Sequence, residues 1–433
     1  MPPVRTRPDP DFTQPRLSEC RGCGLLQHVP ALGPGTAAHC GRCGTTLHRV
    51  RRHPLEHSLA LTVAGTILLA VTCATPLMSV ESAGIIHDAG LFSGPEELVR
   101  RGMGALGLVV IVVTVAAPFG KLLGTLYVLA GLRMANAPGH LRRVFVLVER
   151  WSPWAMIDVF VFGVFVAYVK LGDVVTIRLG AGVFALMTLT FVMAWFDGAL
   201  DREAVWEALG HATPAGTVPG GGEVRRPAAT PVGCEACGLV TVAPPPGGKC
   251  PRCGTRLHVR KPDSLSRTWC LVIAAAILYV PANLYPVLTV VQLGAGSPST
   301  ILGGVRELIT SRMYPLAALV FFASIAVPML KLVGLSLMLI ATQTGRASWL
   351  RDRTRLYHVV RWVGRWSMID IFMESLLGAL VRFGSVITIE PGIGAVAFCA
   401  VVVLTMIAAE TFDPRLMWDT AAQQVGPSAV QSG

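Results

Sequence analysis

The sequence predicts an all-α polytopic membrane protein, built as two tandem four-helix transmembrane units that are each preceded by a small cytoplasmic cysteine-rich module. Three observations lead to this prediction. Of the 433 residues, 52% are apolar and 15% are charged, with a mean hydropathy of +0.57, whereas a soluble protein carries roughly 25% charged residues. The apolar residues form eight long blocks. An internal repeat, marked by paired cysteines, divides the chain into two similar halves.

Each apolar block is long enough for one membrane-spanning helix, which needs roughly 20 mostly apolar residues. The blocks lie at 59–80, 103–131, 152–170, 179–196, 268–291, 314–341, 366–382 and 391–410. The first 50 residues are polar and contain cysteines, so we expect no cleavable signal peptide. Eight spans place both termini on the same side of the membrane.

The basic residues indicate which side that is. With a cytoplasmic N-terminus, the cytoplasmic segments hold 28 of the 37 Lys and Arg residues, the outer loops hold seven, and Lys121 and Lys331 lie inside spans. This asymmetry follows the positive-inside rule, so both termini are expected in the cytoplasm. The net charge of +11 therefore reflects topology and contact with anionic lipid, and we expect no nucleic-acid partner.

The internal repeat relates the halves at an offset of 210 residues. CGTTLH at 43–48 recurs as CGTRLH at 253–258, and the prolines and lysines of the second and sixth blocks match at the same offset. After a two-residue insertion, WAMID at 154–158 matches WSMID at 366–370. Because four spans are an even number, both halves have the same orientation and the repeat is parallel.

The repeat also sets the expected domain boundaries. In order, the chain should contain an N-terminal cysteine-rich ribbon with a basic tail, a four-span unit, a Pro/Gly/Ala linker, a second ribbon, a second four-span unit and a disordered tail. The corresponding ranges are 1–53, 54–210, 211–232, 233–262, 263–420 and 421–433.

Each ribbon carries four cysteines in two CxxC pairs. The quartets are Cys20, Cys23, Cys40 and Cys43 in the first half, and Cys234, Cys237, Cys250 and Cys253 in the second. Two CxxC turns present four thiolates to one tetrahedral ion, which is the pattern of a structural zinc ribbon, with iron as the second candidate. Disulfides conflict with a cytoplasmic location, and a redox site would need a single CxxC. We predict one structural Zn²⁺ in each ribbon, with no open position for catalysis.

A lysine lies inside a span in each half, three residues after a proline. A charge at the bilayer centre costs at least roughly 2.5–3.5 kcal/mol, so such residues are usually paired. The next span carries Asp158 in the first half and Asp370 in the second, at a similar estimated depth. We therefore expect Lys121 to pair with Asp158, and Lys331 with Asp370.

Other polar residues surround these two pairs. The expected intramembrane network contains Ser324, Lys331, Ser367, Asp370, Glu374 and Thr405 in the second half, with Thr114, Lys121 and Asp158 in the first. Ionisable groups inside a membrane often mark transport or proton-transfer sites. The denser network favours the second half for such a step. A purely structural pair that locks helix packing is the alternative, with about equal weight in the first half.

Tandem CxxC…CxxC ribbons, each followed by four spans bearing P-x-x-K and W-x-M-I-D, resemble the paraquat-inducible protein A family, including its LetA-type members. The resemblance covers roughly residues 18–420, although the second ribbon has a shorter spacing between its cysteine pairs. It implies an inner-membrane subunit that passes phospholipid to or from a periplasm-spanning tunnel partner with MCE domains. It also implies a proton-linked element at Ser324, Lys331, Ser367, Asp370 and Thr405.

The leading functional hypothesis is therefore a lipid-transport subunit rather than an enzyme, since no P-loop, GxSxG or HExxH motif occurs. This hypothesis predicts an apolar, lipid-sized cavity that opens outward between the spans of one half, with the Lys/Asp cluster below it. The main alternative is a membrane-anchored zinc-ribbon scaffold or signalling protein with tightly packed helices. A membrane redox protein would require redox-active cysteine quartets.

Overall fold

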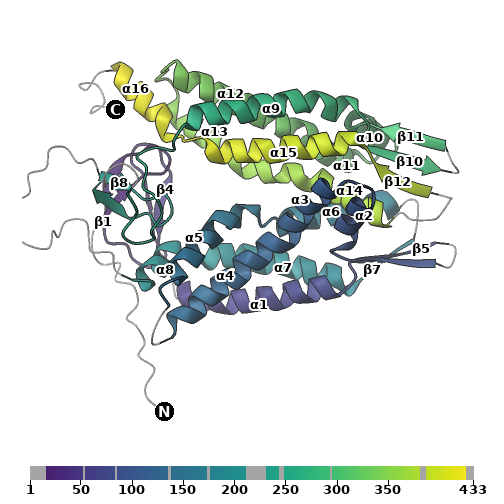
Figure 1. Ribbon diagram of the computed structural model, residues 1–433, viewed down its shortest axis with the longest axis horizontal. Coiled ribbons are helices and arrows are strands. Elements are labelled where there is room, and N and C mark those ends of the chain that lie inside the picture. The colour runs from purple at the N-terminus through teal and green to yellow at the C-terminus, as the bar shows by residue number, and fades with distance from the viewer. Residues whose placement is uncertain are drawn as a thin grey trace, which may run out of the picture.

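The computed structural model describes residues 16–51, 54–82, 85–134, 138–172, 176–210, 231–242, 248–292, 295–380 and 387–425. Figure 1 shows an elongated body of helices with the cysteine-rich modules at one end and two small β-sheets at the other. We call these the ribbon end and the sheet end. Most of the expected linker and tail lies outside the described residues, although helix α16, Arg415–Val425, extends into the range assigned to the tail.

Seven helices in the described part of the chain are long and apolar enough to cross a membrane, which confirms a mostly helical, multi-span fold. They are Leu55–Ala74, Gly104–Leu132, Leu141–Gly172, Ala181–Ala199, Ser264–Leu284, Tyr314–Gln343 and Ile393–Thr411. The expected span at 366–382 is not among them. That region holds a 3-10 turn, η4 at Gly364–Met368, followed by the short helix α14 at Ile369–Leu380.

The spanning helices are of two kinds. The uninterrupted helices are α1 Pro54–Ala74, α7 Ala181–Ala199, α9 Ser264–Leu284 and α15 Ile393–Thr411. The other three spans are composite helices, each made of three consecutive elements. The first consists of α3 Gly104–Ile111, η1 Val112–Ala116 and α4 Ala117–Leu132, and the second of α5 Leu141–Trp151, η2 Ser152–Trp154 and α6 Ile157–Gly172. The third consists of α11 Tyr314–Phe321, η3 Phe322–Ala326 and α12 Val327–Gln343. Helix α13, Leu350–Val363, leads into η4 and α14 in the same way that α5 leads into η2 and α6.

The segments η1 and η3 are π-helical turns, and each ends just before a proline at the second position of the next helix. Pro118 and Pro328 lack the N–H that would bond the carbonyl four residues earlier, at Thr114 and Ser324. Both hydroxyl residues are fully buried, and their side chains donate to carbonyls one turn back. The same local distortion therefore occurs in both halves, and π-bulges of this kind often mark functional sites.

The sheet end corrects the all-α prediction. Each half forms one antiparallel three-stranded sheet there. The first sheet has the order β6-β5-β7 and contains β5 Met78–Ser82, β6 Ile85–Ala89 and β7 Thr176–Leu179. The second has the order β11-β10-β12 and contains β10 Leu288–Gln292, β11 Ala295–Ser299 and β12 Ile387–Pro391. The first and fifth spans end at Ala74 and Leu284, earlier than expected. Pro76 and Pro286 follow those helix ends, and the outer loops satisfy their backbone groups by pairing with each other.

Short helices connect each sheet to the next span. Helix α2, Ser93–Arg100, and helix α10, Ile301–Thr310, lie at the sheet end. Helix α2 buries Pro95, Glu97 and Leu98, and it packs against α14 of the second half. It therefore caps the helical body.

The two halves share one packing scheme and meet along a pair of equivalent helices. Helix α1 packs on α7, and α9 packs on α15, while α6 of the first half packs on α14 of the second. Phe160 and Phe372 occupy repeat-equivalent positions and contact each other edge to face, with ring centroids 5.4 Å apart. Gly163 lies against Phe372, where an added Cβ would approach the Phe372 Cβ to 2.8 Å. A parallel repeat is expected to meet in this way, about an axis that runs along the membrane normal.

The ribbons are short antiparallel strands around the cysteine pairs. The first ribbon contains β1 Arg16–Glu19, β2 Leu26–Val29, β3 Ala37–His39 and β4 Thr46–Arg49, and the second contains β8 Pro231–Gly233, β9 Val240–Val242 and a bridge between Lys249 and Arg256. The strands are too short to enclose an apolar core of their own. Both cysteine quartets instead form part of apolar clusters with helices of the transmembrane units.

These clusters cross between the halves. The first quartet clusters with α13 and α16 residues of the second unit, including Tyr357 and Trp418. The second quartet clusters with α5 and α8 (Arg202–Ala208) residues of the first unit, including Phe145 and Trp206. Matching polar contacts support this arrangement, because Arg351 donates to the Arg42 carbonyl and Arg142 donates to the Arg252 carbonyl.

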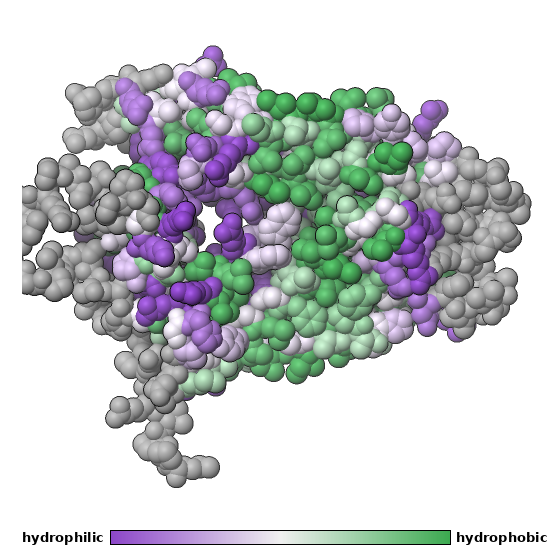
Figure 2. Space-filling model, viewed as in Figure 1, coloured by the Kyte–Doolittle hydropathy of each residue, from purple (hydrophilic) through white to green (hydrophobic). Residues whose placement is uncertain are grey.

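The surface supports a membrane location for the helical body. Figure 2 shows hydrophobic residues over the middle of the molecule, with hydrophilic residues concentrated toward the ribbon and sheet ends. Large apolar side chains such as Phe191, Trp195 and Ile277 are more than half exposed on these helices. Exposed apolar surface of this extent is expected where lipid chains are the solvent.

Candidate functional site

The cysteine quartets have the geometry of metal centres. Within each quartet the four sulfurs lie within 4.8 Å of one another, and all eight residues are buried. The Sγ–Sγ distance is 3.4 Å from Cys20 to Cys43 and 3.5 Å from Cys234 to Cys253. A tetrahedral site with metal–sulfur bonds of about 2.3 Å requires roughly 3.8 Å. The quartets therefore fit a bound metal ion, one in each ribbon.

The electrostatics of the quartets favour at least one thiolate in each. A hydrogen bond from Cys23 is the main cause that lowers the pKa of the Cys20 thiol to about 5. Hydrogen bonds from the three other cysteines of its quartet lower the pKa of Cys234. The same hydrogen bonds raise the pKa of Cys23 and Cys237, so a metal ion that binds must displace the protons of these thiols.

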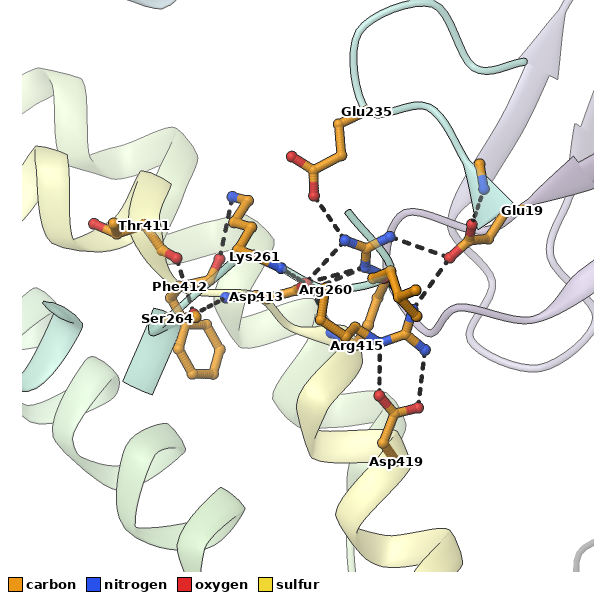
Figure 3. Close-up of polar contacts among 12 residues, drawn as sticks. Glu19, Glu235, Arg260, Lys261, Ser264, Thr411, Phe412, Asp413, Arg415 and Asp419 are labelled. Atoms are coloured by element: carbon orange, nitrogen blue, oxygen red, sulfur yellow. Dashed lines mark hydrogen bonds and ion pairs between the residues drawn. The ribbon is translucent and has the colours of Figure 1, made fainter. Parts of the chain in front are cut away.

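A cluster of ion pairs joins both ribbons to the end of the second unit (Figure 3). Arg415, at the start of α16, contacts Asp413 at 2.8 Å, Glu19 of the first ribbon at 3.1 Å and Glu235 of the second at 2.7 Å. Glu19 also accepts from the Gly233 N–H, so the ribbons contact each other directly. Burial favours the neutral form of Asp413, but the hydrogen bonds and charge of Arg415 outweigh it and lower the Asp413 pKa. We call this group the Arg415 cluster.

The intramembrane network of the second half is present, but as two separate groups. Lys331 is 1% exposed. Its Nζ donates to Ser367 Oγ at 2.8 Å and to Thr405 Oγ1 at 3.3 Å. Gly364 packs directly on its stem, where an added Cβ would lie 2.9 Å from Cε. Among the described residues no carboxylate lies within ion-pair distance of Lys331, so the expected Lys331–Asp370 pair is wrong.

Lys121 in the first half does have an acidic partner, but not the expected one. Its Nζ lies 2.5 Å from Oδ1 of Asp197, at the ribbon end of α7. The expected Lys121–Asp158 pair is therefore also wrong. The sequence does contain a signal for this partner, because Asp197 is the single acidic residue of α7. Its repeat equivalent is Ala409, so the second half has no corresponding carboxylate.

Both wrong pairs have the same physical cause, which is the depth of the helical hairpin. The similar depth expected for each lysine and aspartate assumes that the third span starts at Trp151, but helix α5 begins at Leu141, where it packs against Gly131. Asp158 therefore lies near the level of Thr114, since the Met156 N–H reaches the Val113 carbonyl. In the second half Gly364 is level with Lys331, and Asp370 lies six residues further along, about 9 Å at 1.5 Å per residue.

Asp370 instead belongs to a small cavity toward the sheet end, which we call the sheet-side cavity. Its volume is about 40 Å³, and Ser324, Asp370, Glu374 and Lys170 of the first half line it. Asp370 Oδ1 is buried without a hydrogen-bond partner among the described residues. A cavity of this volume has room for a few water molecules but not for a lipid. This cavity is therefore not the lipid-sized cavity that is expected to open outward within one half.

A larger cavity lies between the two halves toward the ribbon end. This ribbon-side cavity has a volume of about 350 Å³. Both intramembrane lysines, Lys121 and Lys331, line it, together with Thr405 and side chains from α5, α7, α13 and α15. Figure 2 shows the surface hollowed near the ribbon end, with hydrophilic residues at the border of the opening. Lys331 and its hydroxyl partners therefore lie between two cavities that approach from opposite ends of the molecule.

Together these features define a multi-span membrane protein with a duplicated helical unit and two four-cysteine metal-binding modules. The family model described as Paraquat-inducible protein A matches residues 55–210 and 265–422, once in each half. The chain belongs to this family.

Relatives across nearly the whole chain are named as transport proteins. The chain is 32% identical to the intermembrane transport protein PqiA of Escherichia coli (strain K12) over 92% of its own length and 95% of the relative. It is 30% identical to the lipophilic envelope-spanning tunnel protein A of the same organism, over 92% of the chain and 90% of the relative. A probable intermembrane transport protein of Haemophilus influenzae is 27% identical over 95% of the chain. No solved structure matches significantly.

Proposed function

We propose that this protein is the inner-membrane subunit of a phospholipid transport system, which passes lipid to or from a periplasm-spanning tunnel partner with MCE domains. The ribbons and both termini lie in the cytoplasm, the chain crosses the membrane eight times with α14 completing the seventh span, and each quartet binds zinc. The names of the relatives and the positive-inside distribution support this assignment. It also accounts for the polar groups buried inside the helical body, which a scaffold would not need.

The observation that carries a transport step is the environment of Lys331. A permanent buried ammonium requires an anionic partner, yet the partners of Lys331 in the described part of the chain are two hydroxyl groups. The repeat-equivalent lysine of the first half, Lys121, does have such a partner, because it forms an ion pair with Asp197. We assign Lys121 a structural role in helix packing. In the first half, Ala155 and Met193 replace Ser367 and Thr405. Lys331 is thus free to exchange charge during a transport cycle.

Proton coupling follows from the arrangement of the two cavities. Asp370 and Glu374 face the sheet-side cavity, whereas Lys331 faces the ribbon-side cavity. Ser367 is bonded to Lys331 and lies one helical turn before Asp370, and Ser324 lines the cavity with Asp370. We propose that a proton enters through the acids and reaches Lys331 through these hydroxyl groups. Lipid movement would follow the resulting change of charge.

A matched pair of lysine variants tests the proposal. Lys331→Met should lower phospholipid transfer to the purified tunnel partner at least about tenfold, as should Asp370→Asn, because either change breaks the proton path. The repeat-equivalent Lys121→Met should retain most of the activity, since it removes a packing contact to the half-exposed Asp197.

The measurement is transfer of labelled phospholipid from proteoliposomes that contain the full chain, with thermal unfolding as the control for folding. Equal transfer by the wild type, Lys331→Met and Asp370→Asn would rule out the proton path. Absence of transfer by the wild type itself would favour the zinc-ribbon scaffold, the alternative function.

A further inference from the structure

The ribbon-side cavity has an uneven distribution of charge that the proposed proton path does not use. Its basic side chains are Lys121, Arg202, Lys331, Arg361 and Arg365, and its acidic side chains are Glu149, Asp197 and Glu410. Two of the basic groups are neutralised within the cavity wall, because Lys121 pairs with Asp197, and Arg202 with Glu149 at 3.6 Å.

The remaining groups leave an excess of positive charge. Lys331, Arg361 and Arg365 have no ion pair with any described residue, and Glu410 is the single acidic group left to offset them on this wall of the described cavity. Arg361 lies near the end of α13 and Arg365 in the following turn η4, and both side chains line the cavity. Three cations and one carboxylate around one cavity create a positive potential that attracts an anion.

The rest of the lining indicates what kind of anion fits. Apolar side chains also line the cavity, among them Phe145, Val148, Phe196 and Met406. A free phosphate or another small water-soluble anion would gain nothing from contact with these apolar side chains. A phospholipid would gain from such contact, because its phosphate and its acyl chains are joined, and arginine is well suited to bind a phosphate through two hydrogen bonds. The cavity volume of about 350 Å³ lies at the small end of the range for ligand pockets, roughly 300–1,000 Å³. The cavity is open to the surface, so acyl chains can extend outside it.

We propose that the ribbon-side cavity is a binding site for the phosphate group of a phospholipid, held by Arg361 and Arg365 with Lys331 at its inner end. The site lies between the halves, so a headgroup there contacts both units at once. This inference rests on the proposed transport function and adds to it the position at which the lipid is held on the cytoplasmic side. Trp362, which also lines the cavity, is 60% exposed at its border.

Binding of a short-chain phosphatidylglycerol to the purified full chain in detergent, followed by native mass spectrometry, tests the site without requiring transport. Arg361→Gln together with Arg365→Gln should weaken binding at least about tenfold, the effect of losing one or more charge-assisted hydrogen bonds. Arg355→Gln is the matched control, because Arg355 is on the same helix with its side chain 74% exposed and does not line the cavity. It should bind like the wild type.

Two further ligands identify the chemistry. Diacylglycerol with the same chains should bind weakly to every variant, because it lacks the phosphate, and inorganic phosphate should not displace the phospholipid at equal concentration. Equal binding of phosphatidylglycerol by the wild type and the double variant would overturn the site, as would equal binding of diacylglycerol. Displacement by inorganic phosphate would overturn the lipid as occupant. A chain that binds phospholipid in this Arg-dependent way but transfers none would refute the transport function and leave the site intact.

Discussion

Replacing Cys250 with serine is expected to unfold the second ribbon and to loosen helices α5 and α8 of the first transmembrane unit. Loss of one of four ligands removes most of a metal-binding free energy that reaches roughly 10–16 kcal/mol in small zinc modules. The strands β8 and β9 have three residues each and cannot retain their fold without the ion. Since the second quartet clusters with Phe145 and Trp206, the loss should spread to α5 and α8.

Metal content and hydrogen exchange measured on the same sample check this result. Metal should fall from two ions per chain to one, and exchange should increase in 141–151. Cys40→Ser in the first ribbon is the reciprocal variant, and it should increase exchange in 350–363 of the second unit, because that ribbon contacts α13. Cys399→Ser, a buried cysteine outside both quartets, should change neither. Loosening confined to the unit that follows each ribbon in sequence would contradict the crossed arrangement.

Replacing Arg415 with methionine is expected to destabilise the protein by about 3–5 kcal/mol, the usual cost of removing one partner from a buried ion pair. The side chains of Asp413 and Glu19 are 1% and 8% exposed, so both carboxylates would be left buried without their main cationic partner. Arg415 is also the residue that holds Glu235 of the second ribbon, so the two ribbons should separate more easily.

Chemical denaturation in detergent, together with proteolysis between the ribbons, measures this effect. Arg267→Met provides the control, since Arg267 is 58% exposed and pairs with Asp263 across one helical turn at 3.7 Å. An exposed pair of this kind contributes about 0.3–0.5 kcal/mol. The double variant Arg415→Met, Asp413→Asn should recover part of the stability, because it removes a buried charge. A cost below about 1 kcal/mol for Arg415→Met would show that the Arg415 cluster does not hold the ribbons.

Much of the architecture follows from local sequence pattern. Seven of the expected spans and the two cysteine quartets appear in the structure, and the family model matches each half of the repeat once. Each depends on short-range chemistry: runs of apolar residues need lipid, and CxxC turns bring two thiolates together within four residues. Of the residues expected around Lys331, Ser367 and Thr405 contact it, whereas Ser324, Asp370 and Glu374 line a separate cavity.

The partners of buried charges and the placement of the ribbons were decided by tertiary structure alone. Asp158 and Asp370 were misplaced because the depth of a residue depends on where its hairpin turns, and a shift of ten residues at α5 moves a side chain by about 15 Å. The outer strands were missed because their pairing joins loops nearly 100 residues apart. Sequence determined which groups this protein buries in the membrane. Which of those groups contact each other was decided only by the packing of the helices. Contact depends on the relative depth of two helices in the membrane, and the sequence of one helix alone does not determine that relative depth.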